Sequence, residues 1–308
     1  MQEFTIAIHG GAGTILKQDM TDEKEAAYKQ GLSAALEAGY ALLAKGGTAM
    51  DAVLAATRSL EDNILFNAGR GAVFAKDGSQ EMDASIMDGL TMDAGAVCAV
   101  KNIRNPIDLA YAVMKQTPHV LLTGKGANDF ADSIAIQKEA DEYFFSDFRH
   151  RQWEQLQDSD DVALDHNVKD KKFGTVGAVA CDSLGNIAAA TSTGGMTNKQ
   201  WGRVGDSSII GAGTYANNRT CAISCTGHGE LFIKAVAAYD VSCLMEYKGL
   251  SLQEAMNMVV NDKLVKIGGE GGMIGVDAKG NAALLFNSDG MYRGVRGSAG
   301  MNEVAIYK

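Results

Sequence analysis

Gly174-Thr175-Val176-Gly177-Ala178-Val179 is the stretch of this sequence that decides the fold. It places a threonine at the start of an apolar strand of small residues, directly after the charged run Lys169-Asp170-Lys171-Lys172. If the bond before Thr175 is cut, the freed α-amine, with a reference pKa of about 7.7–8.0, can accept the proton of the threonine's own hydroxyl. The stretch therefore predicts a hydrolase whose N-terminal threonine is both nucleophile and base. An ordinary first residue of a strand is the alternative.

Glycine- and threonine-rich motifs lie on both sides of this stretch. They are His9–Gly13 (HGGAG), Leu65–Gly69 (LFNAG), Thr191–Asn198 (TSTGGMTN), Gly202–Ser207 (GRVGDS), Gly211–Asn218 (GAGTYANN) and Thr226–Glu230 (TGHGE). In this order, the motifs resemble the plant-type (type III) asparaginase and isoaspartyl peptidase family of N-terminal-nucleophile hydrolases. The resemblance runs from about Phe4 to the last predicted strand near Tyr307.

The resemblance implies that the chain processes itself. Thr175 would first attack the carbonyl of Gly174 and form an ester that water hydrolyses, which splits the chain into an α subunit, 1–174, and a β subunit, 175–308. It would then attack the amide of the substrate with the same geometry. Gly174 suits this reaction because a residue without a side chain can be strained and approached closely.

The other catalytic positions follow from the same resemblance. Thr193 is expected to hydrogen-bond the hydroxyl of the nucleophile, and Asn67 to help position its amine. Thr226 and Gly227 match the oxyanion site, in which a hydroxyl and a backbone N–H face the oxygen that becomes negative during attack. The glycine turn after His9 lies beside the nucleophile in the family, although a plain strand-to-loop turn is the simpler interpretation of His9 itself.

Arg203 and Asp206 are expected to bind the two charged ends of the substrate. The guanidinium would fork onto an α-carboxylate, and the carboxylate would face an α-ammonium. Without the flanking motifs, a surface ion pair at i,i+3 would be the better interpretation of these two residues. Gly229 would complete the pocket by leaving room for the ligand, and His228 receives no role.

Residues 60–70 resemble the sodium-binding stabilisation loop of the family, in which main-chain carbonyl groups hold the ion. The resemblance implies a structural sodium ion bound by the carbonyls of Leu60, Glu61, Asn63, Phe66, Ala68 and Arg70. No cofactor is expected for catalysis. The resemblance further implies a homodimer of α/β heterodimers.

Periodicity and turn residues predict the elements of the fold. Strands are expected at 4–8, leading into a glycine turn at 10–13, and at 72–76, 81–86, 94–100, on both sides of the turn 182–186, and around 277–281. Helices are expected at 22–45, 48–62, from Pro106, 229–247 and 251–263, with capping patterns at Thr48–Asp51 and Ser251–Glu254. Residues from about 145 to 174 mix charges with little periodicity, which predicts a mobile linker; a plain surface loop is the alternative.

Strand groups on both sides of that linker, each accompanied by helices, predict an α+β fold of four layers. Two packed sheets would lie between helices, an αββα sandwich of the N-terminal-nucleophile type, and residues 1–308 would form a single domain. Neither half could complete this arrangement alone.

Composition restricts the partners of the chain. Its 28 basic and 38 acidic side chains give a net charge of −10 without a basic stripe, which argues against nucleic acid. No apolar run could span a bilayer, and the first residues lack the pattern of a secretion signal, so we expect a cytoplasmic protein without membrane contact. Five cysteines without a two-residue spacing predict buried reduced thiols.

The main functional prediction is an autocleaving threonine amidohydrolase. Its substrates would be L-asparagine, converted to aspartate and ammonia, and isoaspartyl (β-aspartyl) dipeptides. A glycosylasparaginase-like hydrolase of N4-(β-N-acetylglucosaminyl)-asparagine is one alternative, which Gly174 disfavours because relatives of that branch carry aspartate before the threonine. A catalytically inactive binding homologue is the other, which the presence of Thr175, Thr193 and Thr226 disfavours.

Overall fold

The computed structural model describes residues 3–157 and 174–308, whose strands form two sheets. The larger sheet has, in spatial order, β12 (Asn302–Tyr307), β11 (Gly290–Gly297), β1 (Thr5–Gly13), β5 (Thr175–Cys181), β6 (Ile187–Thr193), β2 (Met82–Asp88), β3 (Ala94–Val100) and β4 (Leu121–Thr123). The smaller sheet has β10 (Ala282–Phe286), β9 (Gly271–Asp277), β8 (Cys221–Gly227) and β7 (Thr214–Ala216). Neighbouring strands are antiparallel except β3 and β4.

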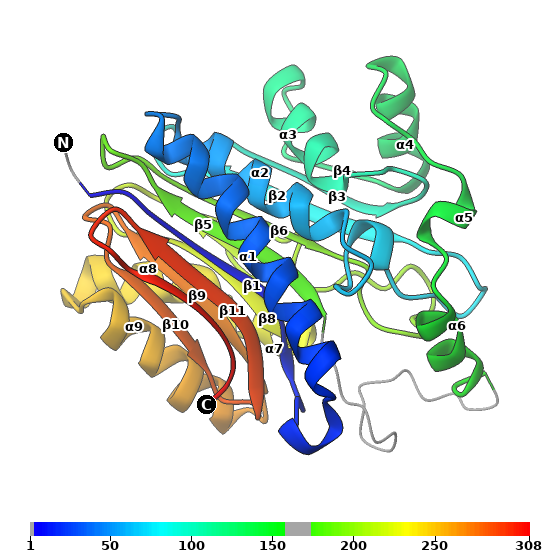
Figure 1. Ribbon diagram of the computed structural model, residues 1–308. Helices are drawn as coiled ribbons and strands as arrows, with labels where there is room; N and C mark the ends of the chain where they lie inside the picture. Colours follow the sequence, from blue (N-terminus) through cyan, green and yellow to red (C-terminus); the bar gives the residue numbers. More distant parts are fainter. Residues whose placement is uncertain (1–2, 158–173) are drawn as a thin grey trace.

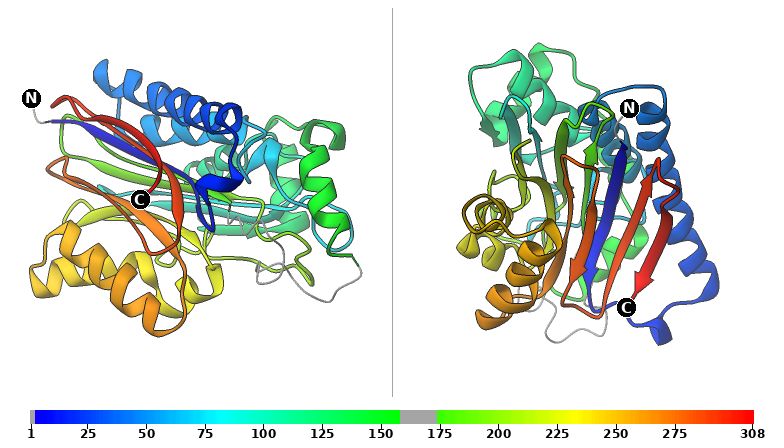
Figure 2. Two further views of the ribbon diagram at one scale, coloured as in Figure 1. Left: turned by 60° about the horizontal axis from the view of Figure 1, so that its bottom comes forward. Right: turned by 90° about the vertical axis from the view of Figure 1, so that its left-hand side faces the viewer.

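Helices lie on the outer faces of the two sheets (Figures 1 and 2). The larger sheet carries α1 (Asp22–Ala44), α2 (Ala49–Glu61) and α3 (Pro106–Gln116), while the smaller sheet carries α8 (Ala237–Lys248) and α9 (Leu252–Met258). One buried apolar cluster fills the space between α1, α2, α3 and the larger sheet, and a second fills the space between the sheets and under α8 and α9. The predicted mixture of helices and sheets is confirmed.

Several shorter helices complete the described chain. They are α4 (Gly124–Ser133), α5 (Asp141–Phe144), α6 (Asp147–Glu154) and α7 (Gly229–Ala235), with 3-10 turns at Lys17–Asp19 and Gly69–Gly71. None of the helices in residues 3–157 and 174–308 combines the length and the apolar character that a bilayer span requires. All five cysteines are free thiols; four are buried and Cys243 is partly exposed.

Local sequence signals explain where the principal elements begin. Thr48 and Asp51 form a capping box at the start of α2, and Ser251 and Glu254 form another at the start of α9, so both predictions are confirmed. Pro106 occupies the first turn of α3, where its missing N–H has no partner to lose. Every residue of β5 is buried, as its central position between β1 and β6 requires.

The prediction of a strand at 72–76 is wrong. The carbonyl of Phe74 accepts from the N–H of Asn198, and the N–H of Lys76 donates to the carbonyl of Lys199. These backbone groups therefore hold a loop against the segment after β6, and the run of apolar residues at 72–75 reflects burial of that loop.

The predicted helix at 229–247 is interrupted. Val236 has a left-handed backbone, with φ of 49°, because the next N–H groups turn to loop carbonyls: Ala238 donates to Ala212 and Tyr239 to Gly211. The predicted helix at 251–263 also changes form, since α9 ends at Met258 and a π-helical turn, Val259–Leu264, follows.

Two boundaries differ from prediction around the central strands. β1 does not stop at the glycines but continues to Gly13, with a bulge between His9 and Ala12. The predicted linker from about 145 is wrong for its first part, because Asp147–Glu154 form α6. Buried Arg149 holds that helix by donating to the carbonyl of Gly71 at 3.2 Å. The rest of the predicted linker, residues 158–173, lies outside the described residues.

Candidate active site

Thr175 stands at the first position of β5, directly opposite Thr193 on β6. Its Oγ1 donates to Oγ1 of Thr193 at 3.1 Å, and the Thr193 hydroxyl in turn donates to the carbonyl of Gly174 at 3.2 Å. The N–H of Gly195 donates to the same Thr193 oxygen at 2.9 Å. The predicted pair of threonines is therefore in contact, and Thr193 also polarises the carbonyl that Thr175 would attack.

Asn67 packs against the bond before Thr175. Its amide nitrogen donates to the carbonyl of Gly195 at 2.7 Å, and its amide oxygen accepts from the N–H of Val73 at 3.0 Å. A Cβ on Gly174 would lie only 2.3 Å from Cβ of Asn67. Glycine is therefore required before Thr175 on steric grounds.

Thr226 and Gly227 end β8, the strand whose Ser224 hydroxyl lies against Gly177 of β5. The Thr226 side chain is fully buried, and its Oγ1 accepts from the N–H of Ala12 at 3.3 Å. Because that contact uses a lone pair, the hydroxyl hydrogen stays free to donate to a developing oxyanion. Gly227 has φ of +146°, and a Cβ there would lie 2.4 Å from the carbonyl oxygen of Glu270.

Gly229 brings the two predicted substrate-binding side chains together. A Cβ at this position would lie 2.8 Å from Oδ1 of Asp206 and 3.0 Å from Nη2 of Arg203. Arg203 does not pair with Asp206; its guanidinium forks onto the carboxylate of Glu230, with distances of 2.8 Å and 2.9 Å. The surface i,i+3 ion pair considered from the sequence is therefore absent from these residues.

Asp206 is buried, and its Oδ2 has no hydrogen-bond partner. Burial raises the pKa of Asp206 to about 7, although the positive charge of Arg203 opposes this shift. Burial is the largest influence on Glu230 and alone would raise its pKa, but the hydrogen bonds and the positive charge of Arg203, together with smaller contributions, lower that pKa overall. A buried carboxylate oxygen without a donor suits a ligand that brings its own N–H groups, such as an ammonium.

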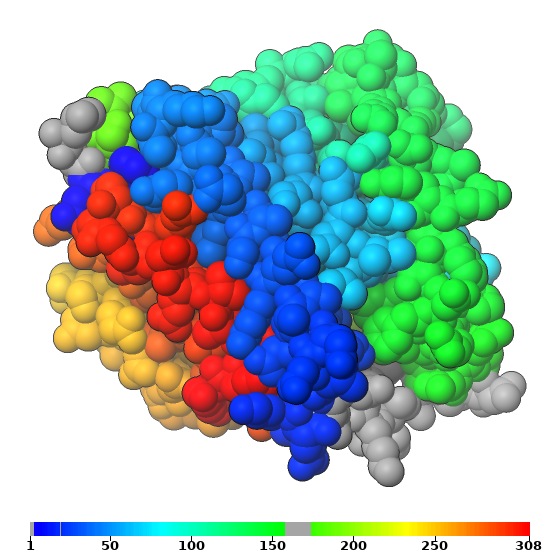
Figure 3. All heavy atoms as spheres, viewed as in Figure 1, coloured from blue at the N-terminus to red at the C-terminus, as the bar shows by residue number. Residues whose placement is uncertain are grey.

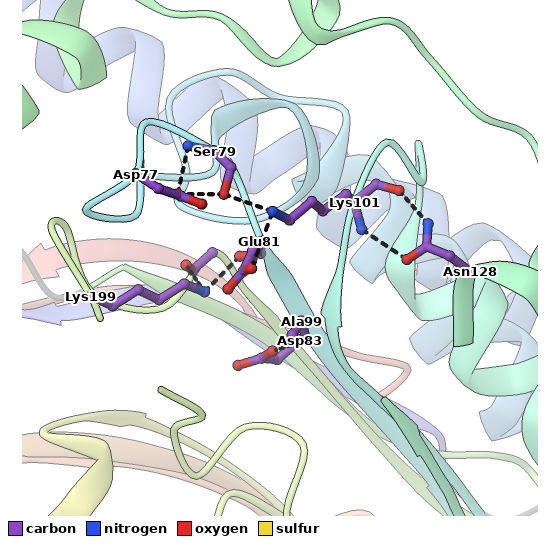
Figure 4. A network of polar contacts seen from close by, with 9 residues as sticks. Asp77, Ser79, Glu81, Asp83, Ala99, Lys101, Asn128 and Lys199 are labelled. Carbon is purple, nitrogen blue, oxygen red and sulfur yellow. Dashed lines mark hydrogen bonds and ion pairs between the residues drawn. The ribbon is translucent and has the colours of Figure 1, made fainter. Parts of the chain in front are cut away.

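Lys199 is a buried cation that the sequence interpretation did not single out. Its Nζ donates to the carbonyls of Glu81 and Gly194, at 2.7 Å and 3.0 Å. Figure 4 shows it next to Glu81 in a network that continues through Lys101 to Ser79 and Asn128. Burial lowers the pKa of Lys199, with partial compensation from the negative charge of Asp83. Lys199 therefore fixes the backbone just after Thr193.

Residues 60–70 comprise the last two residues of α2 and the turn that follows it, in which carbonyl groups are crowded against glycines. A Cβ on Gly69 would lie 2.6 Å from the carbonyl oxygen of Glu61, and one on Gly71 would lie 2.0 Å from that of Phe66. Oxygen donors of this kind fit a hard monovalent cation. Among the described residues, no group of three or more histidine, cysteine or carboxylate side chains could hold a metal ion.

The geometry of the site agrees with the result of comparison with known proteins. A family model described as asparaginase matches residues 2–306 of the chain. The chain belongs to this family. The isoaspartyl peptidase of Salmonella typhimurium is 52% identical over 297 residues, which cover 95% of each chain. The Escherichia coli isoaspartyl peptidase is 50% identical, over 95% of this chain and 92% of that one. The human isoaspartyl peptidase/L-asparaginase is 42% identical, over 94% and 92%. The predicted family and the prediction of an amide hydrolase are confirmed.

Two residues of this asparaginase-family site were named in the sequence only as parts of motifs. Glu230 binds Arg203, and His9 contacts the carbonyl of Thr175. Both residues stand next to a glycine of a motif, and this position could have marked them as candidate site residues. Neither contact is local, because 27 residues separate Glu230 from Arg203 and 166 separate His9 from Thr175.

Proposed function

We propose that the chain cuts itself before Thr175 and that the freed threonine hydrolyses the β-amide of L-asparagine and of isoaspartyl dipeptides. One observation carries the proposal: Thr175 Oγ1 bonds to Thr193, which bonds to the carbonyl of Gly174. The hydroxyl that attacks and the carbonyl that is attacked thus share one hydrogen-bonding partner. The names of the similar bacterial and human proteins support the choice of substrates.

Self-cleavage proceeds by transfer of the Gly174 acyl group from nitrogen to oxygen. Thr175 Oγ1 bonds to the carbonyl carbon of Gly174, the C–N bond breaks, and the nitrogen takes up the hydroxyl proton to become the α-amine. Water then hydrolyses the ester, which leaves a carboxylate on Gly174 and a free N-terminal threonine. Thr193 stabilises the negative charge on the carbonyl oxygen during this transfer by its hydrogen bond.

The substrate reaction repeats the attack on a β-amide. Asparagine and β-aspartyl dipeptides share an α-carboxylate for Arg203, an α-ammonium for Asp206 and a β-carbonyl for Thr175. The oxyanion faces the hydroxyl of Thr226 and the backbone N–H of Gly227, while the amine of Thr175 takes the proton from Oγ1 and passes it to the leaving nitrogen. Water then hydrolyses the β-aspartyl ester on Oγ1, which releases aspartate and frees Thr175. Asn67 acts through the loop that positions this amine.

The proposal includes the larger organisation of the protein. A single four-layer αββα domain would split into subunits 1–174 and 175–308, and two such α/β units would form a homodimer. The carbonyls of Leu60, Glu61, Asn63, Phe66, Ala68 and Arg70 would hold a sodium ion that stabilises the loop carrying Asn67. The layering of helices on two packed sheets supports the first of these inferences. A cytoplasmic location stays a prediction.

Mass spectrometry of the purified protein tests the proposal. Wild type is expected as fragments 1–174 and 175–308, and Thr175→Ala as one inactive chain with an unchanged melting temperature. An uncut wild type that hydrolyses β-Asp-Leu at a normal enzymatic rate would refute the mechanism. Rapid hydrolysis of N4-(β-N-acetylglucosaminyl)-asparagine, with no cleavage of β-Asp-Leu, would replace the substrate assignment by the glycosylasparaginase alternative.

A further inference from the structure

A chain of fully buried polar side chains runs from the backbone of the nucleophile into the space between the two sheets. Its members come from β1, β8, β6, β7 and β2, in the order His9, Ser224, Thr191, Thr214 and Ser85. The successive side-chain contacts are 2.9, 2.7, 2.5 and 2.8 Å long. At its active-site end, Nδ1 of His9 lies 2.9 Å from the carbonyl oxygen of Thr175.

The contacts of His9 define its protonation. A carbonyl oxygen can only accept, so Nδ1 carries a hydrogen and donates it to Thr175. Burial lowers the pKa of His9 to about 3, so the ring is neutral and Nε2 accepts from the hydroxyl of Ser224. Ser224 then accepts from Thr191, whose 2.7 Å contact is much shorter than its 3.4 Å approach to the carbonyl of Gly213.

The strands around Thr175 are adapted to this contact. The ladder between β1 and β5 ends at His9↔Gly177, two residues short of Thr175, and β1 bulges directly after His9. A Cβ on Gly177 would lie 2.0 Å from Oγ of Ser224 and 2.5 Å from Nε2 of His9, so the His9–Ser224 contact crosses β5 where that strand has no side chain.

We propose that His9, held in its neutral Nδ1–H form by Ser224, is a positioning residue that orients Thr175 for attack. The inference rests on the proposed function of Thr175. A hydrogen bond on the Thr175 carbonyl fixes rotation about its Cα–C bond, and this rotation sets where the amine and Oγ1 point. Cleavage breaks the bond between Gly174 and Thr175, but the hydrogen bond from His9 to the carbonyl of Thr175 remains. Arg203 and Asp206, the proposed substrate clamp, lie in a different part of the chain. Loss of His9 therefore affects the rate of attack and leaves substrate binding intact.

Two substitutions separate this role from simple packing. The side-chain nitrogen of asparagine can occupy the place of Nδ1 and keep the bond to Thr175, whereas that of glutamine reaches the place of Nε2 and loses it. We expect His9→Gln to slow attack about 100-fold, the size of effect that small misplacements cause. His9→Asn should stay within about 10-fold of wild type. Attack is measured as the rate of chain cleavage and as kcat on β-Asp-Leu, with KM unchanged in both variants.

These measurements test the positioning role of His9 separately from the proposed function of Thr175. Equal losses in the two variants, or a loss confined to KM, would overturn the positioning role. Long-range ¹H–¹⁵N spectra of wild type, with the His9 signals identified by their loss in His9→Asn, should show the neutral Nδ1–H tautomer from pH 5 to 8. An Nε2–H tautomer or a charged ring would overturn the inference independently of activity. A wild type that neither cuts itself nor cleaves β-Asp-Leu would refute the proposed function, and the spectra would still decide the state of His9.

Discussion

The carboxylate of Glu230 binds the guanidinium of Arg203 through two parallel hydrogen bonds, Nε to Oε1 at 2.8 Å and Nη2 to Oε2 at 2.9 Å. This bidentate arrangement uses one edge of the guanidinium and fixes its plane. Nη1 and the second hydrogen of Nη2 stay available for another carboxylate. Arg203 is thus oriented before a substrate arrives.

Glu230→Gln is expected to raise KM for β-Asp-Leu about 10-fold with little change in kcat. Glutamine keeps one hydrogen bond but loses the charge-assisted pair, and a difference of about 1.4 kcal/mol corresponds to a tenfold change in binding. Steady-state kinetics on the cut enzyme measures the effect, with Arg203→Ala as the more severe control. Chain cleavage should be normal in both variants, because the precursor bond presents no α-carboxylate. A lower KM in Glu230→Gln would mean that Glu230 competes with the substrate.

Asp206→Asn is expected to stabilise the fold at pH 8 but not at pH 4. The pKa of Asp206 is about 7 in the folded protein because of burial, against about 3.9 in an unfolded chain. Between these values the unfolded state binds fewer protons, so the free energy of unfolding falls as pH rises. Asparagine removes this loss, which is about 1.4 kcal/mol for each unit of pKa difference. Urea unfolding in an uncut Thr175→Ala background measures it; equal effects at both pH values would contradict the assignment.

Gly174→Ala is expected to slow chain cleavage by at least about 100-fold while the fold persists. The added Cβ meets Cβ of Asn67 at 2.3 Å, and Asn67 cannot move because both ends of its amide are bonded. The scissile carbonyl must shift instead, which misaligns the attack. Gly126→Ala is the matched control, since a Cβ there meets nothing within 4 Å. The uncut fraction is followed by denaturing electrophoresis over time.

The distance from Arg203 and Asp206 to Thr175 should make the site selective for β-amides, because it fixes how far the amide lies from the α-carbon of the substrate. Glutamine is longer by one methylene, which costs roughly 1–3 kcal/mol in a fitted pocket and further rate through misalignment. We expect β-Asp-Leu to be cleaved faster than asparagine, because its leaving amine carries an apolar side chain. Glutamine and α-Asp-Leu should be nearly inert. Comparable kcat/KM values for all four compounds would rule out the clamp of Arg203 and Asp206.

The pairing of the two threonines proposed as catalytic could be predicted from the sequence. The turn at 182–186 lies midway between Thr175 and Thr193, so a regular hairpin must place them opposite each other, as the register of β5 and β6 confirms. Gly174 could also be understood in advance as a residue approached closely, although Asn67 as its neighbour could not. Such contacts depend on how the loop after α2 packs.

Long-range polar contacts escaped prediction. A glutamate in the first turn of a helix, such as Glu230 in α7, is ordinary for electrostatic reasons and gives no hint of a partner. His9 looked like part of a turn because glycines follow it, but β1 continues through them and turns the ring toward Thr175. The apolar run at 72–75 was misleading, because a buried loop can be as apolar as a buried strand.

The strands of the larger sheet alternate between the two parts of the chain that meet at Thr175. Strand β1, from before Thr175, lies between β11 and β5, which come from the later part, and β6 pairs with β2. Figure 3 likewise shows the last residues, in red, against the blue helix α1. Folding of this interleaved sheet from a single uncut chain is a unimolecular reaction. If the chain is cut before Thr175 as proposed, the same assembly from the separated pieces becomes a bimolecular reaction whose rate depends on concentration. Such a cut would make loss of the native state irreversible: the lifetime of the cut protein would be governed by how slowly it unfolds, and a dilute, denatured sample should recover activity only if it was denatured before it was cut.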